Sequence, residues 1–214
     1  MSREPIVLLH GSGTGAYSWS PISHALTTLG LEVFAPDMLG YGRSPPASDA
    51  YGIAEEVAHL RALLDARGIG DFHLVAHSLG AMFGLHLRFA LGARVTRLTL
   101  IEPVVTSILL DAGEHDAYAE LWELHERFMG VWPDHAAAAQ VFVEYWSGPG
   151  SWRTLRNRER AMLTAVAPKL RVEMVATRTD MTPLTAFAAS APPTTLIVGE
   201  NTREAARTVA RLLG

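Results

Sequence analysis

The sequence contains no cysteine, and this absence removes several kinds of chemistry at once. Without thiols the chain cannot form disulfides, a thiolate nucleophile, an iron-sulfur cluster or a zinc site with cysteine ligands. It also lacks a run of 18 apolar residues, and its first apolar run is too short for a signal peptide. We therefore expect a soluble, cytoplasmic protein that has no membrane partner.

An excess of charge of one sign is also missing. The chain has 18 basic and 22 acidic residues, a net charge of -4, and no run of arginine or lysine. A nucleic-acid partner is therefore not expected, because such partners require a basic surface. Hydrophobic residues make up 49% of the 214 residues and charged residues 19%, which predicts one large folded domain or one domain with an insertion.

Short apolar runs alternate with helical patterns in the first half of the chain. The segments that predict strands are 6–9, which is a continuous apolar run, and 31–36, 72–76 and 95–101. Apolar residues at helical spacing predict helices at 20–29, 53–67 and 79–91, the first with Ser20 as N-cap and Pro21 at the first helical position. Such alternation predicts an α/β protein with a mostly parallel sheet flanked by helices on both faces.

The alternation stops at a long segment with helical patterns only. We expect residues 111–185 to form an inserted helical cap, and residues 1–110 and 186–214 to form the α/β core. Within the second part of the core, residues 195–198 predict a strand. Asn201 and Glu204 then resemble a capping box in front of the last helix.

The strongest functional motif is AHSLG at positions 76–80, between an apolar strand and an apolar helix. A nucleophile elbow needs small residues two positions before and after the nucleophile, and Ala76 and Gly80 are small. This turn would expose the hydroxyl of Ser78 and direct the Leu79 amide toward a developing oxyanion. The pattern predicts Ser78 as a nucleophile and Leu79 as an oxyanion donor.

A second motif, HGSG at positions 10–13, follows the first strand. Its glycines allow a close backbone approach to a ligand, and the Ser12 amide is the expected second oxyanion donor. Residues 11–16 also fit a dinucleotide-binding fingerprint, with Asp37 as the ribose acceptor. That fold would place Pro21 inside a helix, at a cost of about 3 kcal/mol. We therefore expect an oxyanion loop and no cofactor, and we expect Asp37 to bind amides of the loop 37–44.

Together, the HG sequence, the PDxxGxGxS loop at 36–44, the small-H-S-x-G elbow and the helical cap resemble the α/β-hydrolase fold family, in its serine-hydrolase branch. The resemblance implies that Ser78 is the nucleophile and that the Ser12 and Leu79 amides bind the oxyanion. It makes residues 6–9 the family's third strand and 195–198 its seventh. The usual leading hairpin and last strand are then absent from this sequence.

The resemblance also indicates where the acid of a catalytic triad should be. The family's usual acid position corresponds to Thr202, which is not an acid. Some members carry the acid after the sixth strand instead, where this sequence has Glu102. Glu102 is therefore the first candidate for the acid, and Glu200 is the second.

No histidine follows the predicted strand 195–198, where the family's general base would be found. His10 and His77 are expected to be structural, and His86 lies too far along its helix to reach Ser78. The cap histidines, expected to face solvent, are His115, His125 and His135. We expect a truncated, nearly inactive sequence whose base lies beyond Gly214, with His125 as the alternative.

The sequence therefore predicts a hydrolase of an ester, thioester or related acyl substrate with an apolar portion. Glu102 would orient the histidine that accepts the Ser78 proton, and no metal site is expected, since His73 and His77 have no third ligand. C–C bond hydrolysis, perhydrolysis and a lyase reaction share these residues and stay open. A noncatalytic binding protein is the other alternative. Its pocket would use aromatic residues that we expect to be cap core, namely Trp122, Phe128, Trp132 and Trp146.

Overall fold

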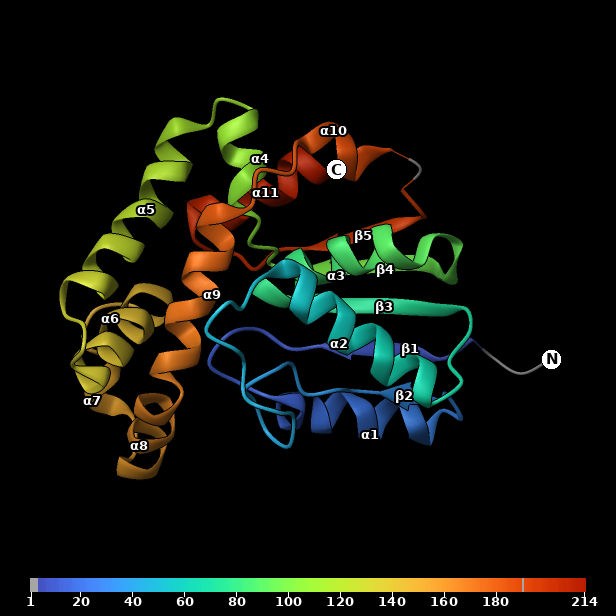
Figure 1. Cartoon of the computed structure of the whole chain (residues 1–214), viewed down its shortest axis with the longest axis horizontal. Helices are drawn as coiled ribbons and strands as arrows, with labels where there is room; N and C mark the ends of the chain where they lie inside the picture. Colours follow the sequence, from blue (N-terminus) through green and yellow to red (C-terminus); the bar gives the residue numbers. More distant parts are fainter. Residues whose placement is uncertain (1–3, 190) are drawn as a thin grey trace.

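The computed structural model describes residues 4–189 and 191–214, which form a parallel sheet flanked by helices (Figure 1). The strands are β1 (Ile6–Leu9), β2 (Val33–Phe34), β3 (Phe72–His77), β4 (Val95–Ile101) and β5 (Thr194–Ile197). Their order is β2-β1-β3-β4-β5, and every described pairing is parallel, which confirms the predicted fold class. Parallel strands joined by helices bury apolar runs on both faces of the sheet.

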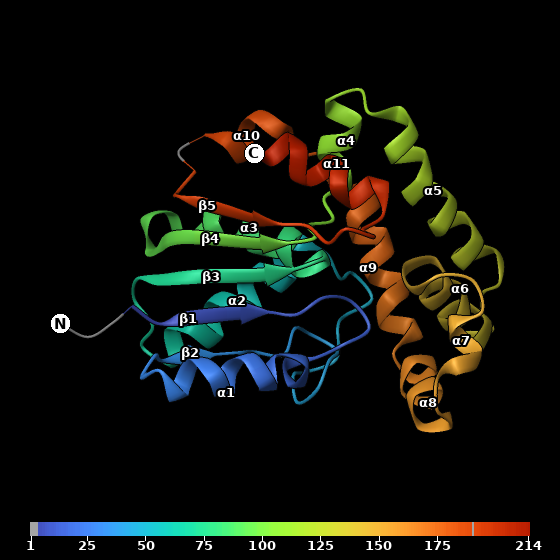
Figure 2. The same ribbon diagram turned by 180° about the vertical axis from the view of Figure 1, so that it is seen from behind.

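Five described helices follow the strands of the core, and one short helix precedes its last strand. They are α1 (Ser20–Thr28), α2 (Ile53–Ala66), α3 (Leu79–Leu91), α4 (Thr106–Asp111), α10 (Leu184–Ala188) and α11 (Glu204–Leu213). Helices α2 and α3 cover one face of the sheet, and from behind the strands lie in front of them (Figure 2). Helix α3 follows β3 directly and is almost wholly buried, so the residue between them is fixed on both sides.

The segment 111–185, which we call the cap, contains helices and no strand, as predicted. Its main helices are α5 (His115–Gly130), α6 (His135–Ser147), α7 (Ser151–Thr154), α8 (Asn157–Ala165) and α9 (Ala167–Thr179). The cap helices gather beyond the carboxyl ends of the strands, and α9 lies between the other cap helices and the sheet (Figure 2). In an α/β sheet this edge is where ligands bind. The division into a core and a cap at residues 111 and 185 stays a prediction.

Several local predictions need correction. Helix α1 has Trp19 as its N-cap and Ser20 as its first residue, because a 3-10 turn at Ala16–Trp19 precedes it. Pro21 lies in the first helical turn, where its missing N–H costs no hydrogen bond. A dinucleotide-binding fold would require an α-helix that begins near Gly13, whereas the first α-helix begins at Ser20. Strand β2 is two residues long, shorter than the predicted 31–36.

The predicted capping box before the last helix is also wrong. Helix α11 begins at Glu204 with Arg203 as its N-cap, and no side chain caps it. Asn201 therefore lies outside the helix, two residues before the N-cap. None of the described helices is long and apolar enough to cross a membrane.

Candidate active site

Ser78 lies at the sharp turn between β3 and α3. Its φ of 56° is in the left-handed region, which costs a residue with a side chain on the order of 1–3 kcal/mol. Two hydrogen bonds hold this backbone: the Ser78 amide donates to the Ile101 carbonyl (2.9 Å), and the Val104 amide donates to the Ser78 carbonyl (3.3 Å). The strain is thus maintained by the neighbouring strand end, and the turn has the form expected of a nucleophile elbow.

Two glycines allow the loop after β1 to pack against this turn. A Cβ atom at Gly80 would overlap the carbonyl oxygen of His10. A Cβ atom at Gly11 would lie 3.0 Å from the Cβ of Ser78, closer than side chains normally approach. Both positions therefore require glycine because of contacts between segments, in addition to the steric need of the turn itself.

Ser12 and Leu79 line the same pocket as Ser78. Leu79 is the first residue of α3, and the first amides of a helix have no carbonyl acceptor within that helix. Such an amide, at the positive end of the helix dipole, can donate to a negatively charged oxygen. The two residues whose amides the sequence predicts as oxyanion donors therefore line the same pocket as the candidate nucleophile.

His10 fixes the loop that carries Ser12. Its ring is fully buried, with Nδ1 2.9 Å from the Gly11 carbonyl oxygen and Nε2 3.1 Å from the Met38 amide. The amide can only donate, so Nε2 accepts and Nδ1 carries the proton. Burial is the main cause that lowers the pKa of His10 to about 4, which keeps the ring neutral at pH 7. The expected structural role of His10 is confirmed.

Tyr41 joins the same loop to the cap. Its hydroxyl accepts a hydrogen bond from the Gly13 amide (2.9 Å) and donates one to Oε2 of Glu173 on α9 (2.9 Å). Burial raises the pKa of Glu173, against the opposing effects of the Lys169 charge and of the Ser12 and Tyr41 hydroxyls. Glu173 was not identified from the sequence, because its partners lie far away along the chain.

Lys169 extends this contact into the core. Its side chain is 5% exposed, and Nζ lies 3.5 Å from both Glu56 Oε2 and Glu173 Oε1. The ammonium also lies 3.3 Å from the centre of the Tyr51 ring, and the Tyr51 hydroxyl donates to Glu56 (2.6 Å). A buried cation is tolerated only with such partners. Lys169, Glu173, Glu56, Tyr41 and Tyr51 form one polar cluster, which we call the cap–core cluster.

Glu102 extends from the carboxyl end of β4 to the loop after β5. Its Oε1 accepts hydrogen bonds from the Thr202 hydroxyl and from the Gly199 amide (3.2 Å). Its φ of 46° is left-handed, like that of Ser78 at the end of the neighbouring strand. Glu200, the second candidate for the acid, is exposed. The carboxylate of Glu102 therefore lies beside Thr202, the position at which the resemblance placed an acid.

The histidines differ from expectation at one place. His125 does not face solvent: it is 8% exposed and lines the pocket that contains Ser78. Its Nε2 accepts a hydrogen bond from Arg178 Nη1 (3.2 Å), and burial and the Arg178 charge lower its pKa. The helical spacing indicated that His125 is buried. The apolar residues Leu121, four positions before it, and Phe128, three positions after it, lie on the same helical face. Burial likewise lowers the pKa of His77, which the Glu102 charge opposes.

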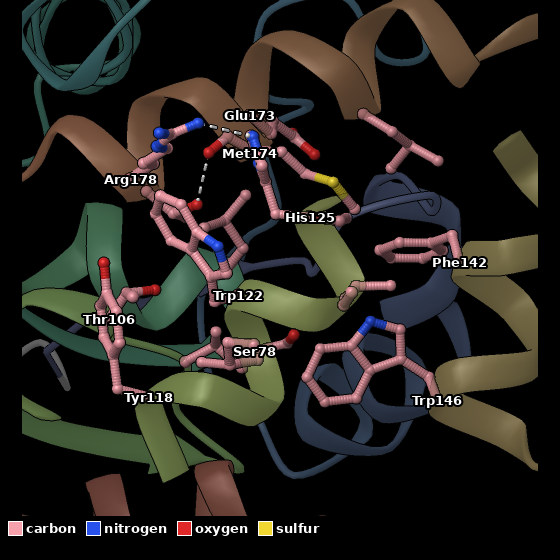
Figure 3. Close-up of a pocket in the computed structure, with 17 residues that line it drawn as sticks. Ser78, Thr106, Tyr118, Trp122, His125, Phe142, Trp146, Glu173, Met174 and Arg178 are labelled. Carbon is pink, nitrogen blue, oxygen red and sulfur yellow. Dashed lines mark hydrogen bonds between the residues drawn. The ribbon is translucent and has the colours of Figure 1, made fainter. Parts of the chain in front are cut away.

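The pocket has mainly apolar walls supplied by the cap (Figure 3). Trp122 and Trp146 line it, contrary to the expectation that they are only cap core, whereas Phe128 is fully buried. The space between the walls, including the part open to solvent, is about 660 Å³. A volume of this order suits a small organic ligand. Its remaining apolar or aromatic lining residues include Val104, Tyr118, Leu121, Phe142, Leu170 and Met174.

Asp37 has the structural role predicted for it. Oδ1 accepts from the Ala16 amide (2.8 Å) and Oδ2 from the Arg43 amide (3.2 Å). The carboxylate is therefore used within the loops around the site. Both carboxylate oxygens of Asp37 thus accept hydrogen bonds from backbone amides, whereas the dinucleotide interpretation assigned this carboxylate to a ribose.

Comparison with known proteins agrees with this geometry. The profile of the Alpha/beta hydrolase family matches residues 6–214. The chain is 37% identical over 113 residues to the 2-hydroxy-6-oxo-2,4-heptadienoate hydrolase of Pseudomonas putida, and 36% identical over 100 residues to Lipase LipV of Mycobacterium tuberculosis. These matches cover 51% and 47% of this chain, but only 41% and 37% of the two relatives.

Solved structures show the same fold over nearly the whole chain. A hydrolase from Pseudomonas aeruginosa PA01 superimposes with a TM-score of 0.73 and is 26% identical in sequence. The likeness covers 98% of this chain and 77% of that protein. The fold similarity is therefore far more extensive than the sequence similarity to the curated relatives.

Proposed function

Since this chain belongs to the alpha/beta hydrolase family, we propose that it is a serine hydrolase that uses Ser78 to cleave an ester, thioester or related acyl substrate. The observation that carries the proposal is the strained Ser78 turn, which lies in one pocket with the Ser12 and Leu79 residues. The apolar walls of that pocket favour a substrate with an apolar portion.

In the proposed first step, Ser78 Oγ attacks the carbonyl carbon of the substrate. The carbonyl oxygen becomes an oxyanion that accepts hydrogen bonds from the Ser12 and Leu79 amides. The hydroxyl proton passes to a general base and then to the leaving alcohol or thiol, which leaves an acyl group on Ser78. Water, deprotonated by the same base, then releases the acid and restores the serine.

The general base is the part of this mechanism that the pocket does not supply. His125 is the one histidine on the pocket wall among residues 4–189 and 191–214, and its Nε2 already accepts a hydrogen bond from Arg178. Its lowered pKa makes it a weak base as well. We propose that Glu102 orients the histidine that serves as the base, as the family resemblance implies.

Two other functions use the same arrangement. The Pseudomonas putida relative is named as a hydrolase of an oxo-dienoate, which favours keeping C–C bond hydrolysis as the second candidate. A noncatalytic binding protein would use the pocket without activating Ser78. Reactivity of Ser78 separates this last alternative from both enzymes.

A fluorophosphonate probe tests the proposal, because the serine oxygen displaces fluoride from phosphorus and stays covalently attached. We expect slow labelling of the chain, faster labelling when imidazole is added as an external base, and an adduct that peptide mass spectrometry locates on Ser78. Ser78→Ala should abolish labelling, whereas Ser20→Ala, at an exposed position on α1, should not. Labelling that persists in Ser78→Ala would contradict the proposal. Loss of labelling in His125→Ala that added imidazole restores would make His125 the base.

A further inference from the structure

One part of the pocket carries a positive charge that no described carboxylate neutralises. Arg178, near the end of α9, lines the pocket, and its guanidinium lies 4.0 Å from the centre of the Trp122 ring (Figure 3). The ion pairs found among residues 4–189 and 191–214 do not include it. By contrast, Arg203 and Arg211 pair with the cap residues Glu120 and Glu114.

The guanidinium of Arg178 has two contacts with the pocket wall and donors to spare, on a residue that is otherwise exposed. Its central carbon lies over the Trp122 ring, and Nη1 donates to His125 Nε2 at 3.2 Å. A guanidinium has five N–H donors, so most of those of Arg178 have no protein acceptor among the described residues. A planar fork of this kind matches a carboxylate, which can accept two parallel hydrogen bonds.

The buried ring of His125 adds a second observation at this end of the pocket. The residue is 8% exposed and lines the pocket, and its Nδ1 has no hydrogen-bond partner among the described residues. Because Nε2 accepts from Arg178, the neutral ring carries its proton on Nδ1. A buried donor without an acceptor is uncommon in native proteins and calls for a functional explanation. A bound anion would stabilise this polar end of the pocket.

The negative groups near Arg178 do not cancel its charge. Glu173 also lines the pocket, but its Oε1 lies 3.5 Å from the Lys169 ammonium, and burial raises its pKa. Glu126, which follows His125 on α5, is exposed. Glu173 accepts a hydrogen bond from the Tyr41 hydroxyl, and Arg178 lies five residues further along α9, a rise of about 7.5 Å. Arg178 is therefore about one and a half helical turns from the residue that contacts Tyr41.

We propose that Arg178, which lies over the Trp122 ring and donates a hydrogen bond to His125, binds a carboxylate of the substrate. This carboxylate is at the end of the acyl group opposite the ester. The substrate is then a half-ester or half-thioester of a dicarboxylic acid, with an apolar chain between its two ends. The ester end of this assignment rests on the proposed function. Binding of the carboxylate requires only Arg178 and the pocket.

Calorimetric titration of the Ser78→Ala chain tests this assignment without turnover. The probes are the anion of monomethyl suberate and the neutral dimethyl suberate, which has the same length. We expect the anion to bind more tightly, and Arg178→Gln to lower that preference about tenfold or more, as for a lost hydrogen bond to a charged group. Arg178→Lys keeps the charge but not the fork, so its preference should be intermediate.

The matched control is Arg158→Gln, which removes the same charge from an exposed position on α8 of the cap. It should leave the preference for the anion unchanged. Equal affinity for the two probes, absence of binding, or a preference that survives in Arg178→Gln with its thermal unfolding unaltered would each overturn the anion site. If Ser78 fails to react with fluorophosphonate while the Arg178-dependent preference is present, the hydrolase proposal fails and the anion site stands.

Discussion

The carboxylate of Glu102 accepts a hydrogen bond from the hydroxyl of Thr202, although 100 positions separate the two residues. Glu102 directly follows β4, and Thr202 lies in the loop that follows β5, at the position where the family resemblance placed an acid. A carboxylate from one strand end thus takes the place of a carboxylate expected from the next. This relationship makes Glu102 the better candidate for the triad acid than the exposed Glu200.

An exchange of the acid between these two positions tests this interpretation. In a form of the protein that hydrolyses esters, Glu102→Gln should lower kcat by about 10²- to 10⁴-fold, because the base loses its orientation and its charge partner. Glu200→Gln should leave kcat nearly unchanged. The double variant Glu102→Gln with Thr202→Asp returns one carboxylate to the same place, and it should recover part of the lost rate. A larger effect of Glu200→Gln than of Glu102→Gln would assign the acid to Glu200.

Tyr41 should connect cap packing to the reactivity of Ser78. Tyr41→Phe leaves the Gly13 amide without its acceptor and removes one of the donors to Glu173, both in a buried region. We expect a loss of about 1–3 kcal/mol in the free energy of unfolding, measured in urea, together with slower phosphonylation of Ser78. Tyr17→Phe, at a side chain that is 56% exposed, is the control and should change neither quantity. Unaltered stability in Tyr41→Phe would show that these two hydrogen bonds contribute little.

The buried ring of His10 predicts acid sensitivity. Its pKa is about 4 in the folded protein against 6.5 for an ordinary histidine, so the unfolded chain binds a proton first as the pH falls. The free energy of unfolding should therefore decrease between pH 6.5 and 4, by at most about 3 kcal/mol from this residue. His10→Gln keeps a donor and an acceptor but does not titrate. Urea unfolding of the two proteins at pH 7 and pH 5 should show the smaller decrease in His10→Gln, and equal decreases would refute the role of His10.

Lys169 is the one lysine of the sequence, which makes the cap–core cluster open to a chemical test. Its side chain is 5% exposed and pairs with Glu56 and Glu173, so an amine-acetylating reagent should not reach it in the native protein. We expect one acetyl group, on the N-terminal amine, under native conditions and a second one in urea. The N-terminal amine serves as the internal control in the intact mass spectrum. Equal rates of acetylation at both amines in native buffer would mean that this cluster is open.

The sequence predicted those features whose causes are local. Strands β1 and β4 have the predicted bounds. For β1 the reason is that a buried parallel strand reads as a continuous apolar run. The Ser78 turn was predicted for a similar reason, since its steric requirement involves residues two positions away. Asp37 was correctly assigned to the loop amides on the same local grounds.

The features that were missed depend on contacts between distant segments. Glu173 and Tyr41 are 132 positions apart, and no pattern in either segment indicates the other. His125 has the helical spacing of a buried residue, but a histidine on a polar helix was assigned to the solvent side. The capping box at Asn201 failed because the helix begins after Arg203 and the neighbouring Thr202 hydroxyl binds Glu102 instead.

A crystal structure of the chain after reaction with fluorophosphonate would show whether Ser78 and the two amides act together. We expect a phosphorus atom bonded to Ser78 Oγ, with one phosphonyl oxygen about 2.7–3.1 Å from the amide nitrogens of both Ser12 and Leu79. The alkyl part of the probe should lie between the apolar walls of the cap. An adduct on another residue, or a phosphonyl oxygen directed away from both amides, would contradict the assignment of this site as an acyl-transfer centre.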